Sequence, residues 1–168
     1  MTPDKPSLLS GQLMLTAERR LENPTSLTPA DLRRATSDIY YALFHKVCEA
    51  LVIPIGSDPE SKAFRDTYIT LYRLPDHAYL EQKCKEVRSH AFSDAVKHFA
   101  AQLVTFKNKR QIADYDPIAK FEISIVKNDW SIANSVLTDF NSVTPEEQAR
   151  FAFFVALRGR RPEGKGEN

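Results

Sequence analysis

The chain has 168 residues, of which 42% are hydrophobic and 27% charged, and its formal net charge at pH 7 is +1. This length is typical of one ordinary domain. The composition excludes a disordered chain, which would combine few apolar residues with a high net charge. A net charge near zero also gives no global attraction to nucleic acid. Five glycines and ten prolines favour helices that begin at proline over a strand-rich fold, which needs many glycine turns.

The charge is distributed unevenly along the sequence. Positions 73–110 contain eight Lys or Arg against four acids, positions 111–147 contain two against seven, and positions 150–168 contain five against two. The basic segments indicate either a local anion-binding surface or the ordinary solvated faces of helices.

Cysteine spacing and hydropathy indicate the cellular compartment. Cys48 and Cys84 do not form a CxxC pair, and no apolar run approaches the roughly 20 residues of a membrane span. We therefore expect a soluble, cytoplasmic protein with reduced thiols and no membrane segment. The scattered His and Cys residues predict no metal site and no cofactor.

Proline and capping residues divide the first half of the chain into helices. Apolar residues recur every four positions between Pro6 and Glu22 and predict a first helix. Thr28-Pro29-Ala30-Asp31 combines an N-cap hydroxyl, a proline at the first helical position and an acid in the first turn. It predicts a long helix to about Val52, stopped by Ile53-Pro54-Ile55-Gly56. Asp58-Pro59-Glu60 repeats the signal and predicts a shorter helix that ends at Leu74.

The second half carries further start signals. Asp76 and Ser93 are N-cap candidates for two segments that form either one helix or two. Asp116-Pro117 predicts the start of a long helix that includes Phe140. Thr144-Pro145-Glu146-Glu147 is a capping box, and it predicts a last helix to about Arg158.

These segments together predict an all-α fold, an up-and-down bundle of four to five main helices with short extra helices. We expect positions 1–158 to form a single domain. Positions 159–168 have no apolar periodicity and are rich in Gly and Arg, so we expect a disordered basic tail.

A first polar constellation lies on the long second helix. Ser37, Tyr41 and His45 follow one another at four-residue spacing, with Arg33 one turn before them, so they share one helix face. They could form an aromatic and imidazole platform for a base or a phosphate. They could equally form a polar seam between helices, because buried Tyr and His side chains find partners inside bundles.

A second polar constellation occupies positions 107–117, where we expect a helix end, a turn and a helix start. It contains three cations, two carboxylates and a tyrosine: Lys107, Lys109, Arg110, Asp114, Asp116 and Tyr115. Capping explains part of it, since cations in a last turn complement the helix dipole and Asp116 can cap the next helix. Arg110 and Asp114 can also pair at four-residue spacing.

Three segments resemble the HEPN superfamily of small helical bundles. Positions 37–45, Ser-Asp-Ile-Tyr-Tyr-Ala-Leu-Phe-His, are similar to its Ala-Tyr-Tyr-Ala-x-Phe-His helix. Positions 110–116, Arg-Gln-Ile-Ala-Asp-Tyr-Asp, are similar to its Arg-x-x-Ala-Asp-Tyr-Asp segment. Tyr72-Arg73-Leu74-Pro75-Asp76-His77 lies between them, and the resemblance covers roughly positions 28 to 158.

The resemblance implies a bundle of four or five helices that is often a homodimer and that in many members cleaves RNA. It also implies a nucleotidyltransferase-type or other mobile-element partner. The RNA-cleaving members carry an Arg followed, after four to six residues, by a His. In this chain Asp114 and Tyr115 stand where that His would follow Arg110, and only three residues separate Arg73 from His77.

Two functions follow from these observations. In the first, the chain binds RNA or a nucleotide, as a metal-independent ribonuclease of a toxin–antitoxin or defence system. Arg110 then holds a phosphate, and His45 or Tyr115 assists proton transfer. The binding residues of this site are Tyr41, Arg33, Lys107, Asp114, Asp116, Arg73 and His77.

In the second function, the chain is a non-catalytic helical interaction module whose polar cluster is structural. A closed, mutually hydrogen-bonded cluster favours this second function. An open basic groove favours the first.

Overall fold

The computed structural model describes residues 8–22, 25–56 and 65–158, and this part of the chain is helical without strands. The all-α prediction is therefore confirmed. The helices are α1 (Leu9–Leu21), α2 (Pro29–Val52), α3 (Arg65–Tyr72), α4 (His77–Glu86), α5 (Asp94–Tyr115), α6 (Ile123–Ser142) and α7 (Pro145–Ala156), with 3-10 turns η1 (Ile53–Ile55) and η2 (Val87–Ser89).

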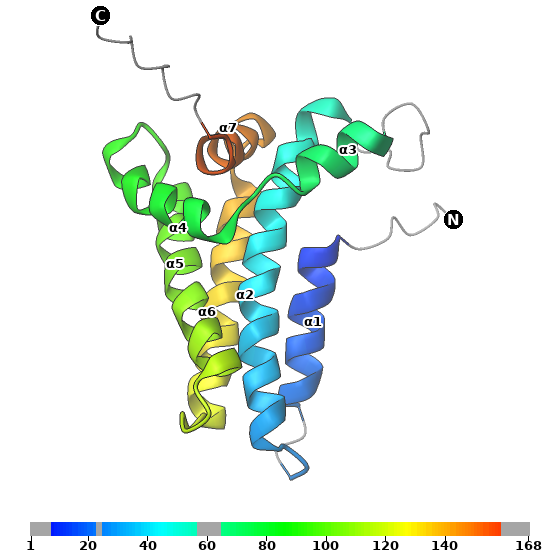
Figure 1. Cartoon of the computed structure of the whole chain (residues 1–168), viewed down its shortest axis with the longest axis vertical. Coiled ribbons are helices and arrows are strands. Elements are labelled where there is room, and N and C mark those ends of the chain that lie inside the picture. The colour runs from blue at the N-terminus through cyan, green and yellow to red at the C-terminus, as the bar shows by residue number, and fades with distance from the viewer. Residues whose placement is uncertain (1–7, 23–24, 57–64, 159–168) are drawn as a thin grey trace, which may run out of the picture.

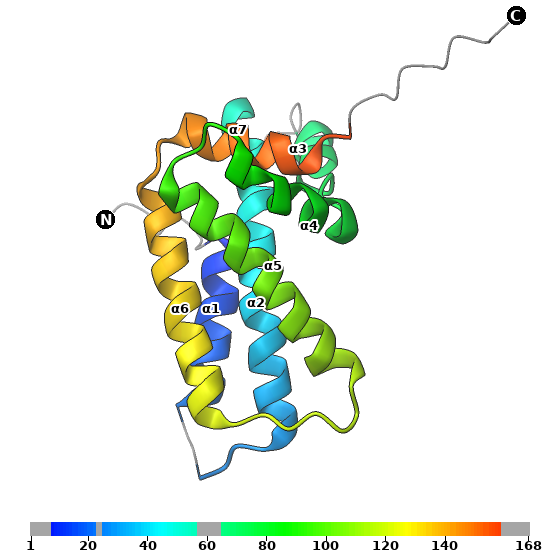
Figure 2. The same cartoon turned by 90° about the vertical axis from the view of Figure 1, so that its left-hand side faces the viewer.

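Four long helices form the bundle and three shorter helices gather at one end of it. Helices α1, α2, α5 and α6 alternate in direction, while α3, α4 and α7 lie around the end where α2 finishes (Figures 1 and 2). Helix α2 is central, because it packs against α1, α3, α5, α6 and α7. Most side chains of α2 are therefore buried.

Aromatic side chains fill the core where α5, α6 and α7 meet. Phe99, Phe140 and Phe151 are almost completely buried. The rings of Phe99 and Phe140 stack with their centroids 4.2 Å apart, and Phe151 meets both edge-on. Each such side chain stabilises the fold by roughly 1.5–3 kcal/mol through its burial.

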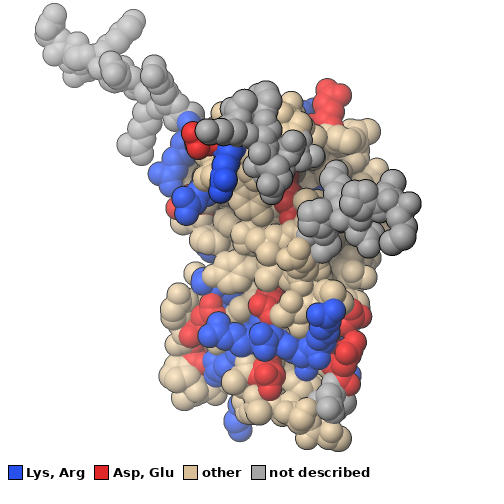
Figure 3. Space-filling model, turned by 90° about the vertical axis from the view of Figure 1, so that its right-hand side faces the viewer, with Lys and Arg blue, Asp and Glu red and all other residues tan. Residues whose placement is uncertain are grey.

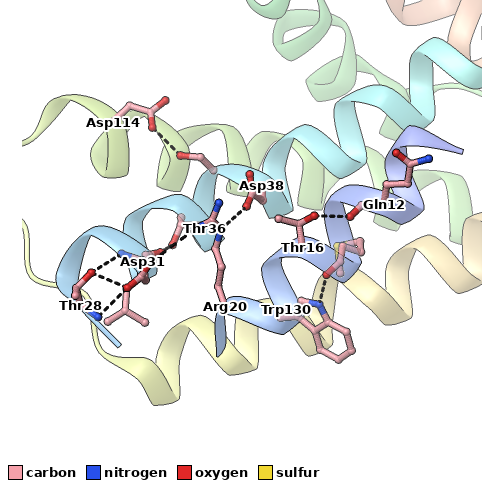
Figure 4. A network of polar contacts seen from close by, with 12 residues as sticks. Gln12, Thr16, Arg20, Thr28, Asp31, Thr36, Asp38, Asp114 and Trp130 are labelled. Carbon is pink, nitrogen blue, oxygen red and sulfur yellow. Dashed lines mark hydrogen bonds and ion pairs between the residues drawn. The ribbon is translucent and has the colours of Figure 1, made fainter. Parts of the chain in front are cut away.

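Most of the predicted helix starts are confirmed. Thr28 Oγ1 accepts a hydrogen bond from the Asp31 amide at 3.2 Å, and Asp31 Oδ2 accepts one from the Thr28 amide at 3.0 Å (Figure 4). Asp76 and Ser93 cap α4 and α5, which are two separate helices. Thr144 caps α7, but the predicted box is half formed, because the carboxylate of Glu147 accepts from the Ser93 amide instead.

The predicted helix start at Asp116-Pro117 is wrong. Helix α5 continues to Tyr115, and α6 begins only at Ile123. The carboxylate of Asp116 accepts hydrogen bonds from the amides of Ile118 and Ala119 at 3.0 and 3.1 Å, so it closes a turn inside the connecting loop. Positions 107–115 are therefore helical throughout, and the last turn of α5 contains no basic residue.

Several predictions fall outside the described residues. The helix start at Asp58 and the tail at 159–168 belong to this group. Helix α3 ends at Tyr72, two residues before the predicted end. Cys48 and Cys84 are both buried and unpaired. No helix in the described part of the chain has the length and hydropathy that crossing a bilayer requires.

Candidate functional site

Arg110 on α5 lies opposite Tyr41 on α2 at the centre of the predicted site. Its Nη2 donates a hydrogen bond to the Tyr41 hydroxyl at 2.6 Å, and its guanidinium lies over the Tyr41 ring, 5.2 Å from the centroid. Its Nε lies 2.6 Å from Asp114 Oδ2, an ion pair without hydrogen-bond alignment. Asp114 Oδ1 accepts a hydrogen bond from Ser37 Oγ at 2.6 Å (Figure 4). These four side chains form a polar network that joins α2 to α5.

The network is closed rather than open to a ligand. The side chains of Arg110 and Asp114 are only 18% and 21% exposed. The carboxylate neutralises the guanidinium at short range, so a phosphate would have to compete with a negative group that is already in contact. Removing one member of such a pair leaves the other partly buried and unpaired, which costs more than the pair contributes.

Tyr115 extends the network to the surface. Its ring lies 5.6 Å from the Arg110 guanidinium, on the same helix, and its side chain is 73% exposed. The contact is a cation–π interaction, which contributes about 0.5–1 kcal/mol at an exposed site. The hydroxyl of Tyr115 forms no hydrogen bond within the described residues. Tyr115 therefore covers Arg110 with its ring and has no partner that would help its hydroxyl move a proton.

The two histidines of the predicted site, His45 and His77, lie in the same seam but form hydrogen bonds with different tyrosines. His45 Nδ1 shares a 3.0 Å hydrogen bond with the Tyr72 hydroxyl on α3, and His77 Nδ1 shares one of 2.6 Å with the Tyr40 hydroxyl. Burial lowers the pKa of His45. Burial also lowers the pKa of His77, and the positive charges of Arg110 and Lys107 lower it further. Both rings are therefore neutral at pH 7.

His77, rather than His45, is the imidazole next to Arg110. Its ring lies 6.2 Å from the ring of Tyr41, which Arg110 contacts, and 4.2 Å from the ring of Phe44. His45 lies one helical turn beyond Tyr41 on α2, where it stacks on Tyr72. The sequence predicted the shared face of α2 correctly, but the placement of His77 depends on how α4 packs against α5 and α7.

Arg33 holds the loop between α5 and α6. Its Nη1 donates hydrogen bonds to the carbonyls of Ala113 and Asp116, and its Nη2 donates one to the carbonyl of Ala119, each at 2.8 Å. Its guanidinium also lies over the ring of Phe121 at 5.1 Å. The predicted binding residues Arg33 and Asp116 therefore stabilise a loop and are not part of the Arg110 network.

The remaining predicted binding residues lie apart from the network. Lys107 is buried and pairs with Glu81 on α4, which also pairs with Lys85 at 2.6 Å. Arg73 is exposed at the end of α3 and forms no ion pair within the described residues. The structure thus brings together Arg110, Tyr41, Asp114, Tyr115 and His77 out of the predicted set.

On the surface formed by α1, acidic and basic side chains also offset one another. On the α1 side, acidic side chains lie beside basic ones over the lower half of the surface (Figure 3). Arg20 pairs there with Asp38 at 3.1 Å and with Asp31 at 3.8 Å. This face therefore does not concentrate positive charge.

A basic cavity between α4, η2 and α5 was not predicted. It has a volume of about 290 Å³, and its lining contains Lys85, Arg88 and Lys97 without a carboxylate. The excess of cations at positions 73–110 was the available signal, since Lys85 and Arg88 are three residues apart and share a helix face. Lys97 joins them only through the packing of α5 against α4.

Neither metal-binding residues nor similarity to known proteins identifies a function for this site. Within the described residues, no group of three or more His, Cys, Asp and Glu side chains could hold a metal ion. A helical bundle is an architecture that unrelated functions share. No protein-family model, no curated protein and no solved structure matches the chain.

Proposed function

We propose that this chain is a non-catalytic helical interaction module, in which the polar cluster around Arg110 is structural. The observation that carries the proposal is the pairing of Arg110 with both Tyr41 and Asp114 in a little-exposed seam. Metal-independent RNA cleavage needs a cation that is free to stabilise the developing phosphate charge. Here Asp114 neutralises that cation from within the same helix.

The cluster has a clear structural role. It joins α2 to α5 at one end of the bundle through hydrogen bonds to charged groups, each of which contributes about 1.5–3 kcal/mol. Ser37, Tyr41 and Asp114 would all lose a partner if the cluster were broken. Such a network fixes the rotation of α2 relative to α5, because Ser37 and Tyr41 meet only one face of α5.

The outer face of α5 is the surface through which we propose a homodimer. Most of its exposed or partly exposed side chains are polar, aliphatic or aromatic and follow one another every three or four residues: His98, Gln102, Thr105, Asn108, Ile112 and Tyr115. Asp94 and Lys109 lie on the same face, and Lys109 pairs with Asp129 on α6. Depletion of charged residues and enrichment of tyrosine are typical of interface centres. Amides both donate and accept hydrogen bonds, so the same face on a second copy is self-complementary.

A second candidate function is binding of RNA or nucleotide phosphates without cleavage. The cavity lined by Lys85, Arg88 and Lys97 favours it, because Arg88 and Lys97 form no ion pair within the described residues, while Lys85 pairs with Glu81 outside the lining. Binding through such contacts would weaken steeply with salt concentration. This candidate uses a different part of the molecule from the Arg110 network.

The deciding experiment is incubation of the protein with labelled single-stranded RNA in EDTA, scored for cleavage and for binding across salt concentrations. We expect no cleavage, and we expect Arg110→Ala to lower the melting temperature without changing RNA affinity. Cleavage that is lost in both Arg110→Ala and His45→Ala would reject the proposal in favour of a metal-independent ribonuclease. Salt-sensitive binding lost in the Arg88→Glu, Lys97→Glu double variant would establish the second candidate.

Two expectations stay predictions from the sequence. One is a nucleotidyltransferase-type partner in a toxin–antitoxin or defence system, which the resemblance to HEPN proteins implies. The other is a cytoplasmic location.

A further inference from the structure

A groove runs between α1 and α6. One cavity of about 220 Å³ lies towards the end of α1, and a second of about 270 Å³ lies towards its start. The two cavities share Glu18 and Trp130 in their linings, so they lie next to each other along the groove. Its α1 wall extends from Gly11 to Glu22, which corresponds to about 17 Å of helix.

The outer lining residues of each wall recur along one helix face, and those of α6 do so with the period of a coiled coil. The α1 wall presents Gly11, Leu15, Glu18 and Glu22. The α6 wall presents Lys127, Ser131, Asn134, Thr138 and Asn141. Steps of four and three residues alternate along each wall, with an average step of about 3.7 residues on α1 and 3.5 residues on α6. Two neighbouring helices with steps of about 3.5 residues form the holes into which the side chains of a third helix fit.

Gly11 is independent evidence that another backbone can approach α1 closely in the groove. A β-carbon placed on Gly11 would have no neighbour within 4 Å among the described residues, so their packing does not require a glycine there. Glycine nevertheless lies inside the first turn of α1, where alanine would favour the helix more. A glycine on a groove wall allows another backbone to come near.

The floor of the groove is apolar and rigid. Met14, Leu21 and Leu137 are core residues that keep 6%, 4% and 7% exposure and line the groove. Trp130 lies between them, and its Nε1 donates a hydrogen bond to the Met14 carbonyl at 3.0 Å (Figure 4). A tryptophan fixed in this way loses little side-chain entropy when it is covered, as is typical of interface hot spots.

The charges on the rim indicate the chemistry of the occupant. Glu18 and Glu22 lie on the α1 wall, and Lys127 lies on the α6 wall at the same end. Within the described residues, neither Glu18 nor Lys127 forms an ion pair. A helix with basic residues towards α1 and an acidic residue towards α6 would complement both walls.

We propose that the groove between α1 and α6 binds an amphipathic helix of a partner protein, with a narrow apolar stripe of heptad period and basic residues facing Glu18 and Glu22. This rests on the proposed function as an interaction module, and it names the class of partner. The apolar stripe covers Trp130, and a small residue of the partner approaches Gly11.

Trp130 makes the proposal directly measurable, because it is the only tryptophan of the chain. The probe is a tryptophan-free peptide of three heptads, with Leu at position a, Ala at position d, Lys along one flank and Glu along the other. We expect a saturable change in Trp130 emission at peptide concentrations on the order of 10–100 µM. A peptide of the same composition with a scrambled order should give no change.

The key variant is Gly11→Leu, which fills the groove at a position where the chain leaves open space. It should lower peptide affinity at least about tenfold, while leucine's higher helix propensity keeps the melting temperature at or above that of the unsubstituted chain. The matched control is Ser135→Leu, which adds the same side chain to an exposed position of α6 outside the groove lining and should leave affinity unchanged.

Three results would overturn the proposal. One is equal binding of the heptad and scrambled peptides, and another is undiminished binding to Gly11→Leu. The third is a change in Trp130 emission with protein concentration alone, which would place a second copy in the groove. Failure of peptide binding without RNA cleavage would reject the groove and leave the interaction module intact. RNA cleavage lost in Arg110→Ala would reject the non-catalytic module, whatever the peptide does.

Discussion

The conformation of the loop between α5 and α6 should depend on the side chain of Arg33, which lies 80 or more residues earlier in the sequence. The guanidinium of Arg33 donates hydrogen bonds to the Ala113 carbonyl in the last turn of α5 and to two loop carbonyls, each at 2.8 Å, and lies 5.1 Å from the Phe121 ring centroid. Replacing Arg33 by alanine removes all of these contacts together. Lysine in its place would keep the charge but lose the fork that reaches several carbonyls at once.

The expected loss of unfolding free energy follows from the number of these hydrogen bonds and from how exposed they are. A hydrogen bond to a charged donor contributes about 1.5–3 kcal/mol, but the carbonyls of Asp116 and Ala119 belong to half-exposed residues that water can reach after the substitution. The losses are therefore less than additive, and we expect Arg33→Ala to lower the free energy of unfolding by about 3 kcal/mol. This corresponds to a fall in melting temperature of roughly 6–12 °C for a chain of this size.

Urea denaturation followed by circular dichroism measures this change directly. The matched control is Arg34→Ala, which removes the neighbouring, exposed arginine and should change stability by less than about 0.5 kcal/mol. Arg33→Lys should fall between the two. If Arg33→Ala costs no more than Arg34→Ala, the loop carbonyls are satisfied without Arg33, and the reasoning is refuted.

Three further predictions concern titration and capping. Burial lowers the pKa of His45 and His77, so the unfolded chain binds protons at a higher pH than the folded chain does. The free energy of unfolding should therefore decrease as the pH falls below about 6.5. Urea denaturation between pH 7 and pH 5 should show a smaller dependence of this free energy on pH in the His45→Asn, His77→Asn double variant. Burial raises the pKa of Glu49, and two hydrogen bonds from Ser10 oppose this shift. Stability should therefore decrease as the pH rises above about 4.5, and Glu49→Gln should remove this decrease; a variant that keeps the whole decrease would contradict this. Thr28→Ala removes the cap of α2 and should cost about 1 kcal/mol in the same assay.

The helix starts show which parts of the fold local sequence determines. Thr28, Asp76 and Ser93 cap their helices as predicted, because each bond joins residues two or three positions apart. Asp116-Pro117 carries the same local pattern, yet its carboxylate closes a turn. The course of that loop depends on Arg33, which is 83 positions from Asp116, and no local pattern carries that information.

In the candidate site, too, local spacing predicted which residues share a helix face but not which residues they contact. The four-residue spacing of Ser37, Tyr41 and His45 predicted one shared face of α2. Which partner each side chain meets depends on the packing of other helices: Ser37 and Tyr41 meet α5, while His45 meets Tyr72 on α3. The spacing of Arg110 and Asp114 predicted their ion pair, but only the fold reveals that the pair is enclosed.

The two proposed binding surfaces should act independently, because their lining residues do not overlap and α1 and α5 lie on opposite sides of α2 (Figure 1). Helix α1 packs against α2 and α6, whereas α5 packs against α2, α4 and α6. Ile112 is 47% exposed on the outer face of α5, so Ile112→Asp should abolish dimers in sedimentation velocity without unfolding the chain.

The same variant should leave the affinity of the heptad peptide within about twofold, because Ile112 does not line the groove and effects at separate sites add. Gly11→Leu should show the reverse behaviour, with dimers intact and peptide binding lost. If Ile112→Asp weakens the peptide as strongly as Gly11→Leu does, the groove and the α5 face belong to one interface, and the peptide binds an assembly rather than a single bundle.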